Sequence, residues 1–252
     1  MKNFKVVLAY DGGRYNGWQK QGNTENTIQE KLEKILSSIA GTETEVFGSG
    51  RTDAGTHALG QVMNFHMDWD KTAEELLDTL NGRLPEDIAG LSIEEMPPRF
   101  HSRLSAKAKT YSYTLWNSTK PPVFLRKYAF WCREPLNLKA MEQAAEAFRG
   151  SHDFKSFCAN KRMKKSTVRK IYEIRFSAEG EKITIEFYGN GFLYQMVRIL
   201  TGTLIEVGEG KRSAEDMEAI LRAKDRERAG FTAPSRGLCL KEVFYGGEGQ
   251  KW

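Results

Sequence analysis

Two short stretches, FKVVLAY at residues 4–10 and TIQE at residues 27–30, decide the fold of the first part of the chain. The first is apolar and rich in residues that favour strands. The second is a capping box, in which Thr27 caps a helix and Glu30 closes the box. Apolar residues then recur at helical spacing as far as residue 39, and Gly41 marks the helix end. The pattern predicts a strand followed by an amphipathic helix.

The same alternation continues to about residue 96. Strands are predicted over residues 43–47, 58–66 and 88–96, with a glycine-rich loop at residues 48–55. A second capping box, Thr72 to Glu75, opens a helix that runs to about residue 80. The resulting order, β-α-β-β-α-β, is the split βαβ arrangement of ferredoxin-like domains.

The second half shows a similar order without sequence repetition. A strand is predicted over residues 106–117, and a hairpin pair around Gly180. Helices are predicted after Asn137, over residues 192–207 and after Ser213, and a last strand over residues 238–245. The sequence therefore predicts an α+β protein with two halves, residues 1–105 and 106–252, each ferredoxin-like or RRM-like with an antiparallel sheet.

The cysteine content and the distribution of apolar residues argue against a disulfide-rich or membrane-spanning protein. The chain of 252 residues contains three cysteines, at positions 132, 158 and 239, which are odd in number and never in a C-x-x-C pair. A disulfide framework is therefore not expected, and a reducing cytoplasm is the expected compartment. No run of 18 uncharged apolar residues occurs, and the first residues lack the features of a signal peptide, so no membrane partner is expected.

Charge is distributed unevenly along the chain. Residues 1–105 carry 11 basic and 16 acidic residues, a net charge of −5, whereas residues 106–252 carry 27 and 17, a net charge of +10. A basic half of this kind favours a polyanionic partner.

The segment GSGRTDAGTH, residues 48–57, concentrates the residues that could carry chemistry. Its glycines allow backbone to approach a ligand closely. Asp53 in such a segment is either a turn former or an ionised carboxylate able to attack carbon. Arg51 could orient a carboxylate or a phosphate, and His57 is expected to hydrogen-bond within the loop. The sequence contains neither the P-loop nor the dinucleotide-binding fingerprint. It also lacks the common motifs of zinc hydrolases, deaminases and serine hydrolases.

This segment and seven others carry a family resemblance. GRTDAGTHALGQV at residues 50–62 resembles the catalytic motif of tRNA pseudouridine synthases of the TruA family. The similarity extends almost from end to end, through AYDG and YNGWQ at residues 9–12 and 15–19, TIQE at 27–30, FHSR and KTYSY at 100–103 and 109–113, GFLYQMVR at 191–198, and APSRGL at 233–238.

The resemblance implies both a fold and an activity. The fold is one in which the sheets of the two halves join into one extended sheet flanked by helices. The activity is the isomerisation of uridine to pseudouridine at positions 38, 39 and 40 of the tRNA anticodon stem-loop, on a flipped-out base, by a homodimer that uses neither cofactor nor metal.

The resemblance also assigns roles to single residues. Asp53 corresponds to the catalytic aspartate, and Arg198 to the basic residue that pairs with it. Tyr111 corresponds to the aromatic residue that stacks on the target uracil, Leu238 to an apolar pocket residue, and Arg51 to a residue that fills the space of the displaced base. Whether Asp53 attacks C6 of uracil or C1′ of ribose, or removes the C2′ proton, stays open.

A dense run of cations lies between residues 161 and 170 and contains no acid. Such a run is either a solvated surface loop or a contact for RNA phosphates. Its place in the basic half favours the contact with phosphates. Arg14, Arg226, Arg228 and Arg236 could extend this surface. The cations of the run are Lys161, Arg162, Lys164, Lys165, Arg169 and Lys170.

Two other functions compete with an RNA isomerase. A non-catalytic RNA-binding protein with tandem RRM-like sheets would not need Asp53 near RNA phosphates, and the RRM signature string is absent. A nucleoside hydrolase would need a second carboxylate, and none neighbours Asp53 in the sequence. Release of tritium from tRNA labelled at uridine C5 distinguishes the three, because only the isomerase expels that hydrogen and retains the base.

Overall fold

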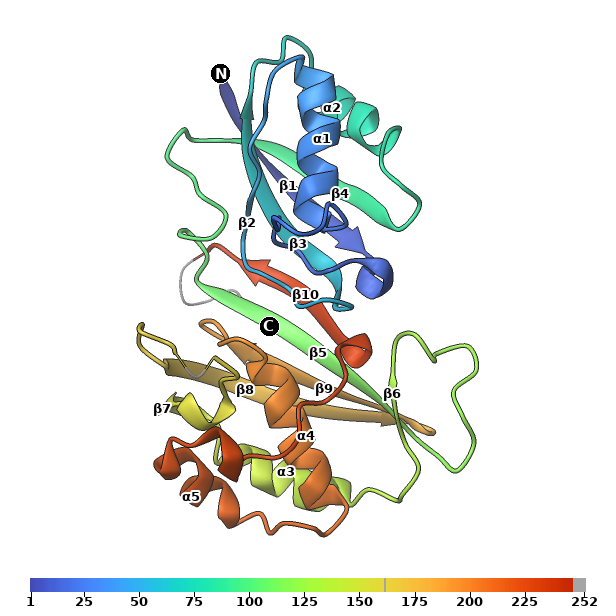
Figure 1. Cartoon of the computed structure of the whole chain (residues 1–252), viewed down its shortest axis with the longest axis vertical. Coiled ribbons are helices and arrows are strands. Elements are labelled where there is room, and N and C mark those ends of the chain that lie inside the picture. The colour runs from blue at the N-terminus through green and yellow to red at the C-terminus, as the bar shows by residue number, and fades with distance from the viewer. Residues whose placement is uncertain (161, 247–252) are drawn as a thin grey trace. The chain divides into compact units, whose positions relative to one another are not determined.

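The computed structural model describes residues 1–160 and 162–246. The chain divides into two compact units. The first comprises Met1–Lys107 together with the chain from Cys239 onward, and the second comprises Ala108–Leu238. Each unit is an α+β structure in which helices accompany a sheet (Figure 1).

The sheet of the first unit has the order β4-β1-β3-β10. Strands β1 (Lys2–Tyr10), β3 (His57–Met67) and β4 (Ile88–Met96) pair antiparallel, and β10 (Leu238–Phe244) runs parallel to β3. Helices α1 (Ile28–Ala40) and α2 (Ala73–Asn81) contact each other and lie on one face of this sheet (Figure 1). The predicted order β-α-β-β-α-β is therefore confirmed for residues 1–96, with the two-residue β2 (Phe47–Gly48) as its second strand.

The helix starts follow from their caps. The Thr27 side chain accepts a hydrogen bond from the backbone N–H of Glu30, and Thr72 and Glu75 form a complete capping box. Gly41 ends α1 with a φ of 72°, a left-handed conformation that glycine adopts without steric cost. Apolar residues of β1 and α1 are fully buried and form the core of this unit: Phe4, Val6, Leu8, Leu32 and Leu36.

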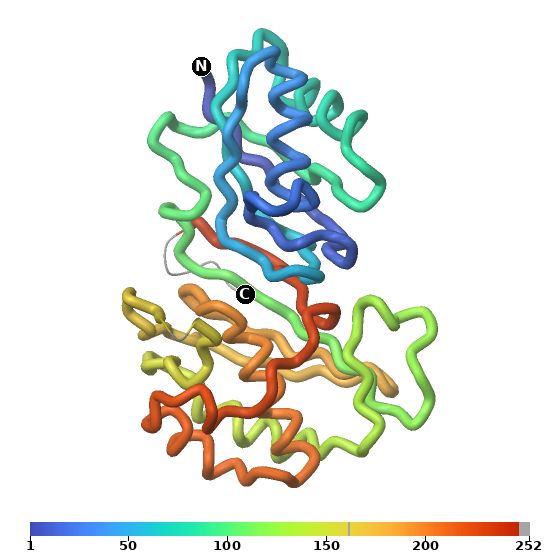
Figure 2. The backbone as a smooth tube through the Cα atoms, in the orientation of Figure 1, coloured from blue at the N-terminus to red at the C-terminus, as the bar shows by residue number. Residues whose placement is uncertain are grey.

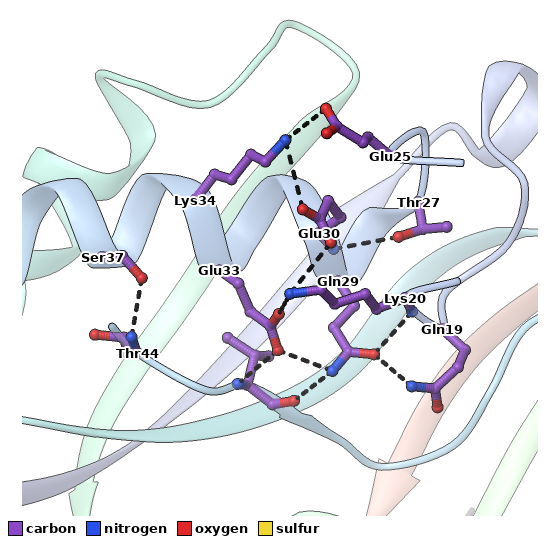
Figure 3. A network of polar contacts seen from close by, with 11 residues as sticks. Gln19, Lys20, Glu25, Thr27, Gln29, Glu30, Glu33, Lys34, Ser37 and Thr44 are labelled. Carbon is purple, nitrogen blue, oxygen red and sulfur yellow. Dashed lines mark hydrogen bonds and ion pairs between the residues drawn. The ribbon is translucent and has the colours of Figure 1, made fainter. Parts of the chain in front are cut away.

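The strand predicted over residues 43–47 is wrong, because only β2 (Phe47–Gly48) pairs with β3. The backbone N–H of Thr44 donates to the Ser37 hydroxyl (2.9 Å), and that of Val46 donates to the Glu33 carboxylate (3.2 Å). Side chains of α1 thus take the hydrogen bonds that a neighbouring strand would have supplied (Figure 3).

The sheet of the second unit has the order β5-β9-β8-β7, with every neighbouring pair antiparallel. Its strands are β5 (Ala108–Asn117), β7 (Gly150–Asp153), β8 (Val168–Glu179) and β9 (Lys182–Gly189), and β6 (Phe130–Cys132) pairs parallel with β5. Helix α3 (Leu138–Glu146) packs on α4 (Met196–Gly208), and α5 (Asp216–Ala223) contacts β7. Asn137 caps α3 and Gly180 turns the hairpin, as predicted.

Three expectations for the second half are wrong. The final strand does not close a second ferredoxin-like repeat, because β10 pairs with β3 and belongs to the first unit from Cys239 onward. Helix α4 begins at Met196 rather than 192, since Gln195 adopts a left-handed φ of 59° just before it. Ser213 does not cap α5: its hydroxyl donates to Glu215, and the helix begins at Asp216.

Short 3-10 helices complete the described chain, at Gly12–Arg14, Lys155–Phe157, Arg226–Arg228 and Ser235–Gly237. Among the described residues, the structure contains no helix with the length and hydropathy needed to cross a membrane.

Candidate active site

Buried polar groups of the first unit hold the loop that carries Asp53. The Tyr10 hydroxyl lies 2.8 Å from the Thr52 hydroxyl, and the Gln61 amide donates to the carbonyl of Gly50 (3.0 Å). The Ser49 hydroxyl donates to the Gln61 amide oxygen (2.6 Å). Tyr10, Ser49, Thr52 and Gln61 are buried. A buried polar group left without a partner costs about 1–3 kcal/mol, so this network specifies one conformation of the loop.

Burial raises the pKa of the Tyr10 phenol well above its ordinary value of 10. Tyr10 is therefore protonated at neutral pH and keeps a hydroxyl hydrogen for this network. A strand residue such as Gln61 among apolar neighbours requires a buried partner. That requirement is the one signal in the sequence that could have identified Gln61 as a residue supporting the loop.

The segment of residues 11–22 packs backbone against backbone on the Asp53 loop. The Trp18 N–H donates to the Thr52 carbonyl (3.1 Å), and the Gly55 N–H donates to the Tyr15 carbonyl (3.2 Å). A Cβ added at Gly12 would lie 1.9 Å from the Thr56 carbonyl oxygen. Gly12 thus permits a close approach that fixes the path of the Asp53 loop.

Asp53 is half-buried and sits at the start of a tight turn. Its carbonyl accepts the Thr56 N–H (3.0 Å), and Gly55 within the turn has a φ of 75°. Asp53 therefore forms part of a turn, and this does not prevent its carboxylate from having a function.

Arg51 is exposed and is tied to helix α1 through two glutamines. Its Nε donates to the Gln19 amide oxygen (2.9 Å), and the Gln19 amide nitrogen donates to the Gln29 amide oxygen (2.9 Å). Figure 3 shows Gln19 beside Gln29, and Gln29 in turn donates to the Val46 carbonyl (3.1 Å). One side of the Arg51 guanidinium is thus oriented by the protein. The sequence motifs included Gln19 and Gln29, but sequence reasoning assigned no role to either.

His57 is buried beside the same loop. Its Nδ1 lies 3.2 Å from the Gly12 nitrogen, which donates to it, and 3.0 Å from a carboxylate oxygen of Asp11. His57 therefore stabilises the 11–22 segment by hydrogen bonding within the loop, as expected.

The other residues predicted for the site belong to the second unit. Tyr111 on β5 is 8% exposed, and its ring meets Phe192 edge to face at a centroid distance of 5.3 Å. Tyr113, two residues on, is fully buried and donates its hydroxyl to the Pro234 carbonyl (2.6 Å). Tyr113 is therefore a packing residue, which leaves Tyr111 as the aromatic candidate on this strand face.

Arg198 on α4 is half-buried, and its guanidinium Nε donates to the Ala233 carbonyl (2.7 Å). The Ala233 N–H donates back to the Arg198 carbonyl (3.1 Å). These two hydrogen bonds attach the segment of residues 233–238 to helix α4. Leu238, at the end of this segment, is buried. Asp53 and Arg51 belong to the first unit, and Tyr111, Arg198 and Leu238 to the second.

The basic run leads into β8, next to the edge strand β7. Arg162, Lys164, Lys165 and Lys170 are exposed, and Lys161 lies outside the described residues. Arg169 differs from the others because it is half-buried and donates to the carbonyls of Ser166 and Val168, and desolvation lowers its pKa. Arg169 therefore also shapes the turn before β8.

Two cations that could have extended the basic surface have structural partners. Arg226 donates to the Gly230 carbonyl and the Thr232 hydroxyl, and burial lowers its pKa. Arg14 forms an ion pair with Asp87, which also accepts the Tyr15 hydroxyl (2.7 Å). Arg226 thus holds its own loop, and Arg14 ties its loop to the turn before β4.

Comparison with known proteins assigns a family. A family model described as tRNA pseudouridine synthase matches residues 6–104 and 144–246. The chain is 45% identical over 245 residues to tRNA pseudouridine synthase A 2 of Bacillus anthracis, covering 97% of this chain and 100% of that protein. It is 46% identical, with the same coverage, to tRNA pseudouridine synthase A of Bacillus sp. (strain KSM-64).

Among solved structures, one chain of a Cbf5-Nop10-Gar1 complex is similar over 94% of this chain and 48% of that chain. The two chains share 11% sequence identity with a TM-score of 0.39, which is too weak a likeness to define a fold. The sequence similarities are much stronger. They extend over nearly the whole chain and include the loop that carries Asp53. The chain belongs to the tRNA pseudouridine synthase family.

Proposed function

We propose that this isomerase converts uridine to pseudouridine at positions 38, 39 and 40 of the tRNA anticodon stem-loop, with Asp53 as the nucleophile. The observation that carries the proposal is a half-buried carboxylate on a loop fixed by buried hydrogen bonds. Such a loop presents the carboxylate in one place without reorganisation during the reaction, which is the condition for efficient catalysis.

The target base must leave the helical stack before Asp53 can act on it. Extrusion costs roughly a few kcal/mol, and stacking on an aromatic ring returns about 1–3 kcal/mol. We assign that stacking to Tyr111, and the apolar wall beside the base to Leu238. Arg198 serves as the cation that favours the ionised carboxylate, because a desolvated carboxylate without a cation takes up a proton.

The exposed cations of the run at residues 162–170 contact phosphates and position the RNA without specifying its sequence. The affinity for tRNA should therefore fall steeply as the salt concentration rises. In a plot of the logarithm of the binding constant against the logarithm of the salt concentration, each phosphate contact contributes about 0.7–0.9 to the steepness of the slope. Changing Lys164 and Lys165 together to glutamine should reduce that slope by about 1.4–1.8. Lys139, exposed on α3, is the matched control. An affinity unchanged between low and physiological salt would contradict this role.

Two further parts of the proposal concern the state of the protein. It is cytoplasmic, in keeping with the free cysteines at 132, 158 and 239. It is also a homodimer, and light scattering of the purified protein should then give twice the mass of one chain.

The experiment that tests the function is the mapping of modified positions in total tRNA after incubation with the pure protein. Pseudouridine at 38, 39 or 40 is the expected result, with tritium released from uridine labelled at C5. Modification elsewhere would overturn the assigned positions. Free uracil would indicate a hydrolase, and tight binding without any tritium release would indicate a non-catalytic RNA-binding protein.

A further inference from the structure

The chain between β5 and β6, residues 118–129, forms a long open loop in the second unit, drawn in light green in Figure 2. We call it the 118–129 loop. It contains Lys120, Arg126 and Lys127, and no acidic residue occurs between residues 118 and 133. These three cations are exposed. All the charged side chains of this loop are therefore basic.

Hydrogen bonds give the loop a definite shape. At its base, the Trp116 indole donates to the Lys120 carbonyl (3.0 Å), and the Trp131 indole donates to the Ser118 carbonyl (2.7 Å). At its tip, Arg126 donates to the Val123 carbonyl (2.7 Å). The backbone around residue 124 is thus supported by contacts on both sides.

On this supported tip the protein exposes apolar side chains. Phe124 is 92% exposed and Val123 is 60% exposed, and Tyr128 follows on the same loop with an exposed ring. Burying a phenylalanine side chain is worth about 1.5–3 kcal/mol, and at this position the described chain does not gain that energy. An exposed apolar patch on a hydrogen-bonded loop, here Phe124 with Val123 and Tyr128, is typical of a contact with another molecule.

The surroundings of Phe124 favour RNA as that molecule. The exposed apolar side chains of the loop are combined with three cations, and residues 118–133 contain no acid that would repel a phosphate. Cations that follow a phosphate backbone, combined with an aromatic ring on which a base stacks, are the usual components of a contact with unpaired nucleotides.

This surface is separate from the basic run at 162–170. Strand register aligns Lys109 with Gly189 and Gly189 with Ile171, so the run lies at the end of the sheet where β5 begins. The 118–129 loop leaves β5 after Asn117, eight residues further along. At about 3.3 Å per strand residue, the two surfaces lie on the order of 26 Å apart, at opposite ends of the sheet.

We propose that the 118–129 loop is a second RNA contact, in which Phe124 stacks on an unpaired base of the tRNA and Lys120 and Lys127 contact its phosphates. The inference rests on the proposed function, since it takes tRNA as the substrate. It adds a binding surface outside the residues assigned to catalysis and outside the basic run.

Equilibrium binding of a fluorescent tRNA transcript at fixed salt tests the stacking role. Phe124→Ala should raise Kd by about fivefold or more, the lower limit for loss of a stacked aromatic. Phe124→Tyr keeps the ring and should stay within about twofold of the wild type. Leu91→Ala, at a residue 53% exposed on β4, is the matched control for loss of an exposed apolar side chain. Equal Kd values for Phe124→Ala and the wild type would overturn the proposal.

Photo-crosslinking identifies the partner directly. With a benzoylphenylalanine placed at position 124, we expect a covalent product with an unpaired nucleotide of the tRNA. A product with a second copy of the chain alone, or no product while tRNA is bound, would overturn the proposal. Failure of the wild type to form pseudouridine in tRNA would instead overturn the proposed function, so the two failures are distinguishable.

Discussion

Asp53→Asn is expected to abolish pseudouridine formation while leaving the protein folded and able to bind tRNA. The amide has nearly the size of the carboxylate but carries no charge, so it can neither attack carbon nor accept a proton effectively. Removing a nucleophile or its partner in other enzymes costs about 10⁴- to 10⁶-fold in kcat, and a loss of that order is expected here. Tritium release from tRNA labelled at uridine C5 measures it.

The folded state should survive this change because the turn depends on the backbone. The Asp53 carbonyl accepts the Thr56 N–H, and the asparagine backbone retains that bond. Asp68→Asn is the matched control, since Asp68 is exposed and pairs with the N-terminal amine. Turnover of Asp53→Asn at the wild-type rate, with an unchanged melting temperature, would show that the carboxylate is not catalytic.

Gly12→Ala is expected to produce the largest loss of stability among single methyl additions to the first unit. The added Cβ would lie 1.9 Å from the Thr56 carbonyl oxygen, and this contact is with backbone, which cannot rotate away. The 11–22 segment or the Asp53 loop must then move. Overpacking costs about 1–3 kcal/mol, and a rigid backbone contact should reach about 3 kcal/mol. Urea unfolding measures the loss, and activity should fall with it.

Gly22→Ala, in the same segment, is the control. Nothing lies within 4 Å of a Cβ at Gly22, and its φ is not among the positive values. The unfolding free energy should therefore stay the same or rise by about 0.4–1 kcal/mol, because alanine restricts the unfolded chain. Equal stabilities of the two variants would mean that the 11–22 segment does not pack tightly on the Asp53 loop.

Elements specified by local chemistry were predictable from the sequence. The side chains of Thr27, Thr72 and Asn137 cap helices, so each helix start is determined by residues next to it in the sequence. The hairpin at Gly180 is equally local. Sequence reasoning failed at residues 43–47, where distant side chains of α1 take the backbone hydrogen bonds. It also failed for β10, whose partner strand is about 180 residues earlier in the chain.

The candidate site shows the same limit. Asp53 stood out because glycines surround it and because the motif resembles that of a family. Tyr10 and Gln61, which support its loop, are separated from each other by 51 residues, and no local pattern links them. Buried hydrogen-bond partners are chosen by the fold, and so they become visible only in the structure.

The return of β10 to the first unit has a consequence for synthesis on the ribosome. Cys239 and Leu240 pair with His57 and Ala58, so the first unit stays incomplete until residues 239 and 240 have been made. Until then, this part of β3 is an open strand edge, which other chains can pair with. A nascent or truncated chain that stops before residue 239 is therefore the form most exposed to aggregation, and slow translation of the segment before residue 239 would lengthen that exposure.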